Sequence, residues 1–290
     1  MNNSLNYDFM MRTLRSFFQD KKKFIEIPAQ SRTSILAACE NPHSITDYTI
    51  GGELFPLPQT GQMWLEYELL QNPQWPGVFC ITTSYRDEKA VIEGRHKRVF
   101  PMFEFESHGT FEDLKKLEAE LLEYLGFNAP ISINYLDAAQ QYETAIVEAE
   151  HEVALAKKYG ATISLEKFPE YTHPFWNMKS DDQGIYQKID ILLHGMETIG
   201  SAEREVDVVK MYNRFFTIEH GEYCNLLFSK FGRDRVLKEL DDYLALSMIP
   251  RFGGGIGVTR LERAMQLSGL LDVRSDYSFV ENEVQQEASL

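Results

Sequence analysis

The chain has 290 residues, 43% hydrophobic and 25% charged, so it can bury the core of one large domain or of two small ones. It has no apolar run long enough for a membrane span and no basic and apolar start typical of a signal peptide, which predicts a cytoplasmic protein with no membrane partner. Its net charge of -15 argues against a broad nucleic-acid-binding surface. Cys39, Cys80 and Cys224 form no CxxC pair, which favours buried free thiols over disulfides or a zinc site.

The first third of the chain predicts a helix, a strand, a loop-rich region and then a hairpin. Apolar residues recur at helical spacing over 7–20, and residues 23–27 alternate like a strand. Turn formers crowd residues 31–61 and indicate loops. Strands at 78–83 and 102–106 flank a long polar segment, which predicts an antiparallel pair joined by a long loop.

The rest of the chain mixes both kinds of element. Thr110 with Asp113 three residues later predicts the start of an amphipathic helix, and a second helical stretch covers about 138–158. Further elements are strands at 162–165 and 189–194 and a helix over 233–247. Because no repeat or linker interrupts the chain, we expect a single α+β domain over residues 1–290, with a helical insertion at about 111–160.

Charged side chains cluster at the end of the predicted hairpin. Arg86, Asp87 and Glu88 follow one strand, the polar segment adds Arg95 and His96 and then Phe100, and the return strand brings Glu104. Guanidinium groups bind phosphate well, and carboxylates bind a divalent ion that bridges phosphates. Together these residues indicate a nucleotide site, although any one of them alone fits an ordinary surface ion pair better.

A glycine-dense run over 252–260 leads directly into a predicted helix. Glycines allow close approach of the backbone, and the following helix N-terminus favours anions. The run matches neither the P-loop nor the Rossmann pattern, so by itself it fits a packing role equally well.

Taken together, these stretches resemble class II aminoacyl-tRNA synthetases. Residues 86–106 resemble motif 2, and 252–261 resemble motif 3. The order of 57–62, 173–175 and 190–204 is similar to that of the aspartyl and asparaginyl subgroup. The resemblance implies an antiparallel β-sheet flanked by helices, with ATP and Mg²⁺ used to form the adenylate of an amino acid.

The resemblance also assigns roles to single residues. Arg86 matches the arginine on the α-phosphate and Arg260 the motif 3 arginine near the γ-phosphate, and these two are the expected catalytic residues. The expected ATP-binding residues are Arg86, Glu88, Arg95, His96, Phe100 and Arg260. The expected amino-acid-binding residues are Thr60, Gln62, Glu66, Glu104 and Arg204. Asp190 and Glu197 match acidic residues that hold magnesium. The role of His173, next to Pro174 and Phe175, stays open between structure and function.

Three departures from the family pattern bear on the product. No anticodon-binding domain precedes the helix at Tyr7, so we expect no tRNA partner. Leu65 stands where aspartyl enzymes have a lysine, and Leu65-Glu66 resembles the asparaginyl pattern, in a subgroup that includes tRNA-independent asparagine synthetases. Motif 1 is irregular, with Gln30 in place of a proline, yet a homodimer remains the expectation.

The leading hypothesis is therefore an AMP-forming ligase that activates aspartate or a close analogue and transfers it to ammonia or a small amine. The alternative is a truncated aspartyl- or asparaginyl-tRNA synthetase paralogue that aminoacylates tRNA or a protein. A third possibility is a catalytically silent regulatory protein that binds an amino acid or a nucleotide.

Overall fold

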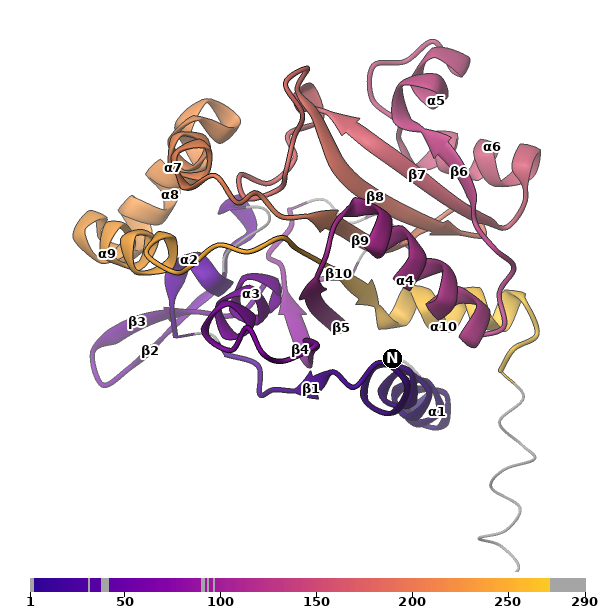
Figure 1. Ribbon diagram of the computed structural model, residues 1–290, viewed down its shortest axis with the longest axis horizontal. Coiled ribbons are helices and arrows are strands. Elements are labelled where there is room, and N and C mark those ends of the chain that lie inside the picture. Colours follow the sequence, from indigo (N-terminus) through magenta and orange to yellow (C-terminus); the bar gives the residue numbers. More distant parts are fainter. Residues whose placement is uncertain are drawn as a thin grey trace, which may run out of the picture.

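An eight-stranded sheet forms the centre of the molecule in the computed structural model, which describes residues 3–30, 32–37, 42–89, 92, 94–95 and 97–271 (Figure 1). In spatial order its strands are β1 (Ile25–Glu26), β4 (Gly77–Tyr85), β5 (Val99–His108), β10 (Arg251–Gly257), β9 (Glu197–Glu203), β8 (Ile185–Leu193), β7 (Thr162–Pro169) and β6 (Ile131–Asn134). The six inner strands are antiparallel, whereas β1 and β6 run parallel to their neighbours at the two edges. The predicted α+β fold with an antiparallel sheet is confirmed, with parallel strands added at both edges.

Helices cover both faces of this sheet. They are α1 (Ser4–Arg15), continued by the π-helix η1 (Ser16–Lys21), α2 (Ser34–Ala37), α3 (Gln62–Gln71), α4 (Phe111–Tyr124), α5 (Tyr135–Gln141), α6 (Ala149–Tyr159), α7 (Val208–Thr217), α8 (Glu222–Phe231), α9 (Arg233–Leu244) and α10 (Val258–Leu267). Short 3₁₀ turns are η2 (Pro42–Ser44), η3 (Glu170–Thr172) and η4 (Ile218–Gly221), and a separate hairpin pairs β2 (Asp47–Ile50) with β3 (Glu53–Pro56).

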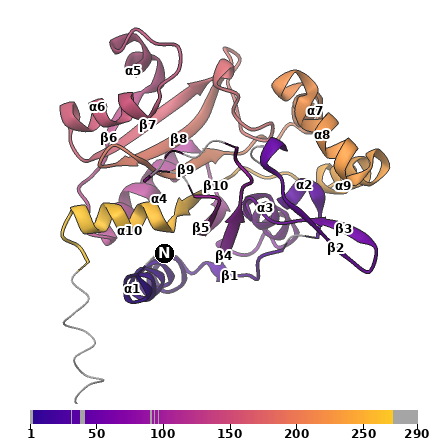
Figure 2. The same cartoon turned by 180° about the vertical axis from the view of Figure 1, so that it is seen from behind.

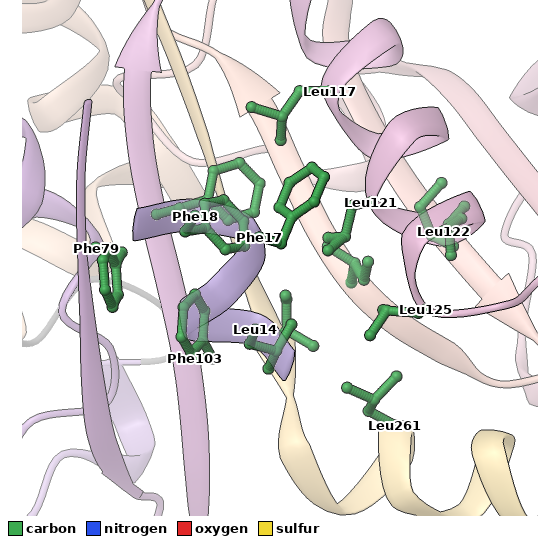
Figure 3. Packing of buried hydrophobic residues seen from close by; sticks show 14 of the residues in the cluster. Leu14, Phe17, Phe18, Phe79, Phe103, Leu117, Leu121, Leu122, Leu125 and Leu261 are labelled. Atoms are coloured by element: carbon green, nitrogen blue, oxygen red, sulfur yellow. The ribbon is translucent and has the colours of Figure 1, made fainter. Parts of the chain in front are cut away.

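The main core lies between one face of the sheet and helices α1, α4 and α10. The rings of Phe18 and Phe103 are 5.1 Å apart, and Figure 3 shows Phe17 between Phe18 and the leucines of α4. Helix α4 begins directly after Thr110, whose backbone N–H donates to Asp113 at 2.9 Å, as the capping pattern predicts. Its buried leucines then fix α4 against the sheet.

On the opposite face two groups of helices stand apart. Helices α2, α3, α7, α8 and α9 form one core, and α5 and α6 form a smaller one over β6, β7 and β8. Figures 1 and 2 show α7 to α9 on one side and α5 with α6 on the other. The inner strands between the two groups carry the site described below.

Several predicted elements need correction. The helix expected over 138–158 is two helices, because α5 ends at Gln141 and Glu143 takes a left-handed conformation with φ 52° before α6 begins. The region 31–61 holds α2 and the β2–β3 hairpin as well as loops, and helices α7 and α8 were not predicted. The glycine run is the inner strand β10.

The expectations for the cysteines and for a membrane span can be compared with the structure. Cys80 and Cys224 are buried free thiols, as expected, whereas Cys39 lies outside the described residues. Across the part of the chain that the structure describes, no helix has the length and apolarity to cross a membrane.

Candidate active site

A pocket of about 270 Å³ opens over β5, β10 and β9, between the two groups of helices; we call it the central pocket. Predicted site residues that line it are Thr60, Gln62, Arg86, Glu88, Arg95, Phe100, Glu104, Glu197 and Arg260. Glu66, Asp190 and Arg204 are not among its lining residues, and His96 lies outside the described residues. The fold thus brings together side chains from four distant stretches of the chain.

One end of the central pocket is cationic. Arg86 follows β4, and its backbone N–H donates to the Arg98 carbonyl at 2.8 Å, which closes the hairpin at this point. The Arg86 guanidinium lies 5.2 Å from the centre of the Phe100 ring and donates to the Ser84 hydroxyl at 3.2 Å. A flat aromatic ring beside a fixed guanidinium suits a nucleobase and its phosphate.

Arg260 lies in the first turn of α10, directly after the glycine strand. It donates to the Glu197 carbonyl oxygen at 2.8 Å and lies 3.4 Å from the Glu197 carboxylate. Burial alone would raise the pKa of Glu197, but the positive charges of Arg260, Lys188 and Arg86 outweigh it and lower that pKa. Glu197 is therefore an ionised acceptor at the cationic end.

The floor of the pocket offers a buried carboxylate, Glu104 on β5. It accepts hydrogen bonds from the Gly61 N–H at 2.8 and 2.9 Å, from the Thr82 hydroxyl at 2.5 Å and from the Thr60 hydroxyl. A Cβ at Gly61 would lie only 2.9 Å from Thr82 and 3.1 Å from Glu104, so glycine is required for this close approach. Glu104 is the group best placed to accept from a substrate ammonium.

Four charged residues, Glu66, Glu106, Arg204 and Arg251, lie fully buried next to this floor; we call them the buried quartet. Arg204 donates to both Glu106 oxygens at 3.1 and 3.0 Å, and Arg251 donates to Glu66 at 2.7 Å. Burial raises the pKa of Glu106 to about 7, although Arg204 lowers it. The quartet touches the pocket through Arg204, which donates to the Gln62 side-chain oxygen at 3.2 Å. Glu66 and Arg204 thus support the pocket from behind.

The predicted magnesium ligands do not form a metal centre with the donors around them. Among the described residues, no group of three or more His, Cys, Asp or Glu side chains is arranged to hold a metal ion. Both oxygens of Asp190 accept from the Lys188 ammonium at 2.6 Å, and Glu197 faces Arg260. Asp190 in this arrangement does not fit a magnesium ligand, and the predicted pair stays a prediction.

Two further residues at the pocket were missed from the sequence. Arg263 lines the central pocket one helical turn after Arg260. Its spacing of three residues puts it on the same face of α10 as Arg260, and this spacing could have predicted its place in the pocket. Glu152 on α6 binds Arg95 at 2.5 Å and also accepts from the Glu197 backbone N–H at 3.1 Å. No sequence signal links Glu152 to these partners, because 57 residues separate it from Arg95.

A second cavity of about 720 Å³ lies near the β7–β8 connection, and His173 lines it. His173 has a left-handed φ of 52°, and its ring centre is 6.4 Å from that of His220. The second cavity is larger, but it contains none of the phosphate-binding candidates. The candidate active site is therefore the central pocket.

Comparisons with known proteins identify the family of the chain. The family model described as tRNA synthetases class II (D, K and N) matches residues 5–283. The asparagine–tRNA ligase of Rhodopirellula baltica is 24% identical over 180 residues, which are 59% of this chain and 33% of that protein.

Solved structures show the same fold. The Pyrococcus horikoshii asparaginyl-tRNA synthetase, complexed with asparaginyl-adenylate, superposes with a TM-score of 0.74 and 20% identity over 90% of this chain and 64% of that one. The Entamoeba histolytica asparaginyl-tRNA synthetase, also with asparaginyl-adenylate, gives 0.69 and 18% over 93% and 64%. The chain thus spans a third of the curated relative and under two thirds of these structures. It belongs to the class II tRNA synthetase family of the D, K and N type.

Proposed function

We propose that this chain is an AMP-forming ligase that activates aspartate or a close analogue as its adenylate and transfers it to ammonia or a small amine. The observation that carries the first step is the polarity of the central pocket. Glu104 supplies a buried anion at the floor, whereas Arg86 and Arg260 supply cations at the other end. An α-amino acid and ATP need such a division, because one brings an ammonium group and the other phosphates.

In the first step a carboxylate oxygen of the amino acid attacks the α-phosphorus of ATP. A new P–O bond forms as the bond from the α-phosphorus to the bridging oxygen breaks, and pyrophosphate leaves. The chain contributes position and charge: Arg86 at the α-phosphate, Phe100 at the base and Arg260 at the outer phosphates. No side chain has to move a proton in this step.

In the second step the amine nitrogen attacks the carbonyl carbon of the adenylate. The carbon–oxygen bond to AMP breaks, the amine loses a proton, and an amide is released. One feature supports a small acceptor. The net charge of -15 disfavours a long polyanion. Leu65 is fully buried in the core around α3, so that position bears on the amino acid and not on the acceptor.

Magnesium belongs to this proposal as the ion that ATP carries on its phosphates. Glu197 is the described carboxylate that lines the pocket closest to Arg260, and it would hold such an ion there. The ion would add positive charge beside the outer phosphates. The arginines hold the phosphates independently of it.

The test begins with pyrophosphate exchange into ATP across the amino acids, which reports adenylate formation whatever the acceptor. We expect exchange with aspartate or asparagine. If no amino acid supports exchange, the proposed adenylate chemistry is wrong and the chain is a catalytically silent binding protein. The next assay supplies ATP, aspartate and ammonium and measures AMP and amide. AMP that appears only after tRNA is added would refute the small-amine acceptor.

The second candidate is aminoacylation of tRNA or a protein, which the names of the similar proteins favour. It predicts labelled amino acid on a macromolecule after acid gel electrophoresis. We also propose a homodimer, and sedimentation at several concentrations tests this.

A further inference from the structure

Lys188 and Asp190 form an ion pair beside the central pocket that the proposed chemistry does not use. Both lie on β8, two residues apart and therefore on the same face of the sheet. The Lys188 ammonium is 2.6 Å from each Asp190 oxygen. Their side chains are only 21% and 13% exposed, so water screens this pair little.

A second contact holds the ammonium in place. Lys188 Nζ lies 3.7 Å from the centre of the Phe168 ring, within cation–π distance. Strand β7 shifts register between Glu166 and Phe168, and Lys167 there has a φ of 64°. The bulge changes the alternation of the strand, so Phe168 shares the core of Leu165 three residues earlier. Backbone geometry thus places the ring beneath Lys188.

The pair lies where a metal ion shared with Glu197 would have to bind. Asp190 is opposite Gly200, and a Cβ on Gly200 would lie 3.1 Å from a Glu197 oxygen and 3.7 Å from an Asp190 oxygen. The two carboxylates therefore converge on one point. Magnesium needs oxygen ligands at about 2.0–2.1 Å, and the ammonium occupies both oxygens of Asp190.

We propose that Lys188 is a built-in cation that replaces a divalent ion at Asp190, so that Glu197 is the one carboxylate of this pair left to bind metal. The ammonium supplies the positive charge that the converging carboxylates require. The inference rests on the proposed function only where it assumes that ATP brings the divalent ion to the pocket. Lys188 then lowers the affinity of the chain for free divalent ions.

The experiment measures Mn²⁺ binding to the full chain by electron paramagnetic resonance, alone and with α,β-methylene-ATP. Lys188→Met removes the ammonium and keeps an unbranched side chain against Phe168. We expect it to bind Mn²⁺ at least about tenfold more tightly than the natural chain, the scale on which neighbours of metal ligands change affinity. The gain should vanish in the double variant with Asp190→Asn. Lys115→Met is the control, because it breaks a similar pair with Glu166 at 2.8 Å on the opposite face.

Lys188→Gln gives an independent answer if Lys188→Met does not fold. It also removes the ammonium, so the proposal expects it to bind Mn²⁺ more tightly than the natural chain. No gain in a folded Lys188→Met or Lys188→Gln, or a gain that persists in the double variant, would overturn it. Titrations without nucleotide test Lys188 even if the ATP analogue has no effect on any variant, an outcome that would count against the proposed function alone.

Discussion

Arg86 lies beside Phe100 at the cationic end of the central pocket, where the α-phosphate of ATP would bind. Replacing it with alanine removes a fixed positive charge from the point where charge develops in the transition state. We expect Arg86→Ala to slow pyrophosphate exchange by roughly 10²–10³-fold, as for other donors of this kind. Arg12→Ala, at a side chain 75% exposed on α1, is the control. An unchanged exchange rate in Arg86→Ala would place the α-phosphate elsewhere.

Glu118 on α4 is a buried carboxyl group on the other face of the sheet. The Ser201 hydroxyl donates to one of its oxygens at 2.6 Å, and the other oxygen has no hydrogen-bond partner among the described residues. Burial raises the pKa of Glu118 from its ordinary 4.5 to about 8, and the Ser201 hydrogen bond offsets this only in part. Between these values the folded chain keeps a proton that the unfolded chain releases. The free energy of unfolding therefore falls as pH rises through this window.

Glu118→Gln removes that pH dependence, because an amide does not ionise. The natural chain loses about 1.4 kcal/mol of its free energy of unfolding for each pH unit in this window, and the variant does not. The difference between the variant and the natural chain should therefore grow by about 4 kcal/mol from pH 5 to pH 8. Urea denaturation at both pH values measures the difference. Glu123→Gln, an exposed position of the same helix, should track the natural chain. Parallel pH profiles for Glu118→Gln and the natural chain would contradict the prediction.

At the scale of single residues, sequence patterns identified residues that line the central pocket, but they did not separate these from the buried residues that support the pocket from behind. The side chains with phosphate or ammonium chemistry, such as Arg86 and Glu104, line the pocket. Glu66 and Arg204 looked similar in sequence, yet they are held in the buried quartet. Pairs such as Glu66 with Arg251 join residues 185 positions apart, and no local pattern records such a contact.

The glycine strand β10 shows why an element can be missed from the sequence. A Cβ on Gly253 would lie 1.7 Å from Glu106 and 2.4 Å from the Phe105 carbonyl oxygen. The glycines therefore let β10 pass between β5 and β9 with the buried quartet beside it. Glycine is unfavourable in strands, so propensity alone gave no signal for this strand. Helix α7 was also missed, although the sequence did contain signals for it: Asp207 at its N-cap and the helical spacing of Met211 and Phe215.

Gly253→Ala tests this account of β10. The added methyl group displaces Glu106 from Arg204, so both overpacking and a broken buried ion pair contribute. We expect the free energy of unfolding to fall by about 3 kcal/mol or more. Gly257→Ala in the same strand is the control, because its Cβ would come no closer than 3.6 Å to Arg260. Equal stability of the two variants in urea denaturation would show that the strand relaxes around the methyl group.

At the scale of the whole molecule, the central pocket depends on two helical groups that pack separately on one face of the sheet. Helix α6 reaches it through Glu152, which binds Arg95 and the Glu197 backbone together. The Arg95 and Glu152 side chains are each 12% exposed, so their ion pair is shielded from water. Glu152 thus holds Arg95 in place relative to β9.

Glu152→Gln weakens this link and keeps the size of the side chain. Hydrogen bonds to charged groups contribute about 1.5–3 kcal/mol, so we expect the KM for ATP in pyrophosphate exchange to rise about tenfold, with a smaller change in kcat. Glu150→Gln is the matched control, because Glu150 lies on the same helix with its side chain 79% exposed. A lower KM in Glu152→Gln would mean that Glu152 competes with the phosphates for Arg95. In that case α6 would restrain the arginine instead of presenting it.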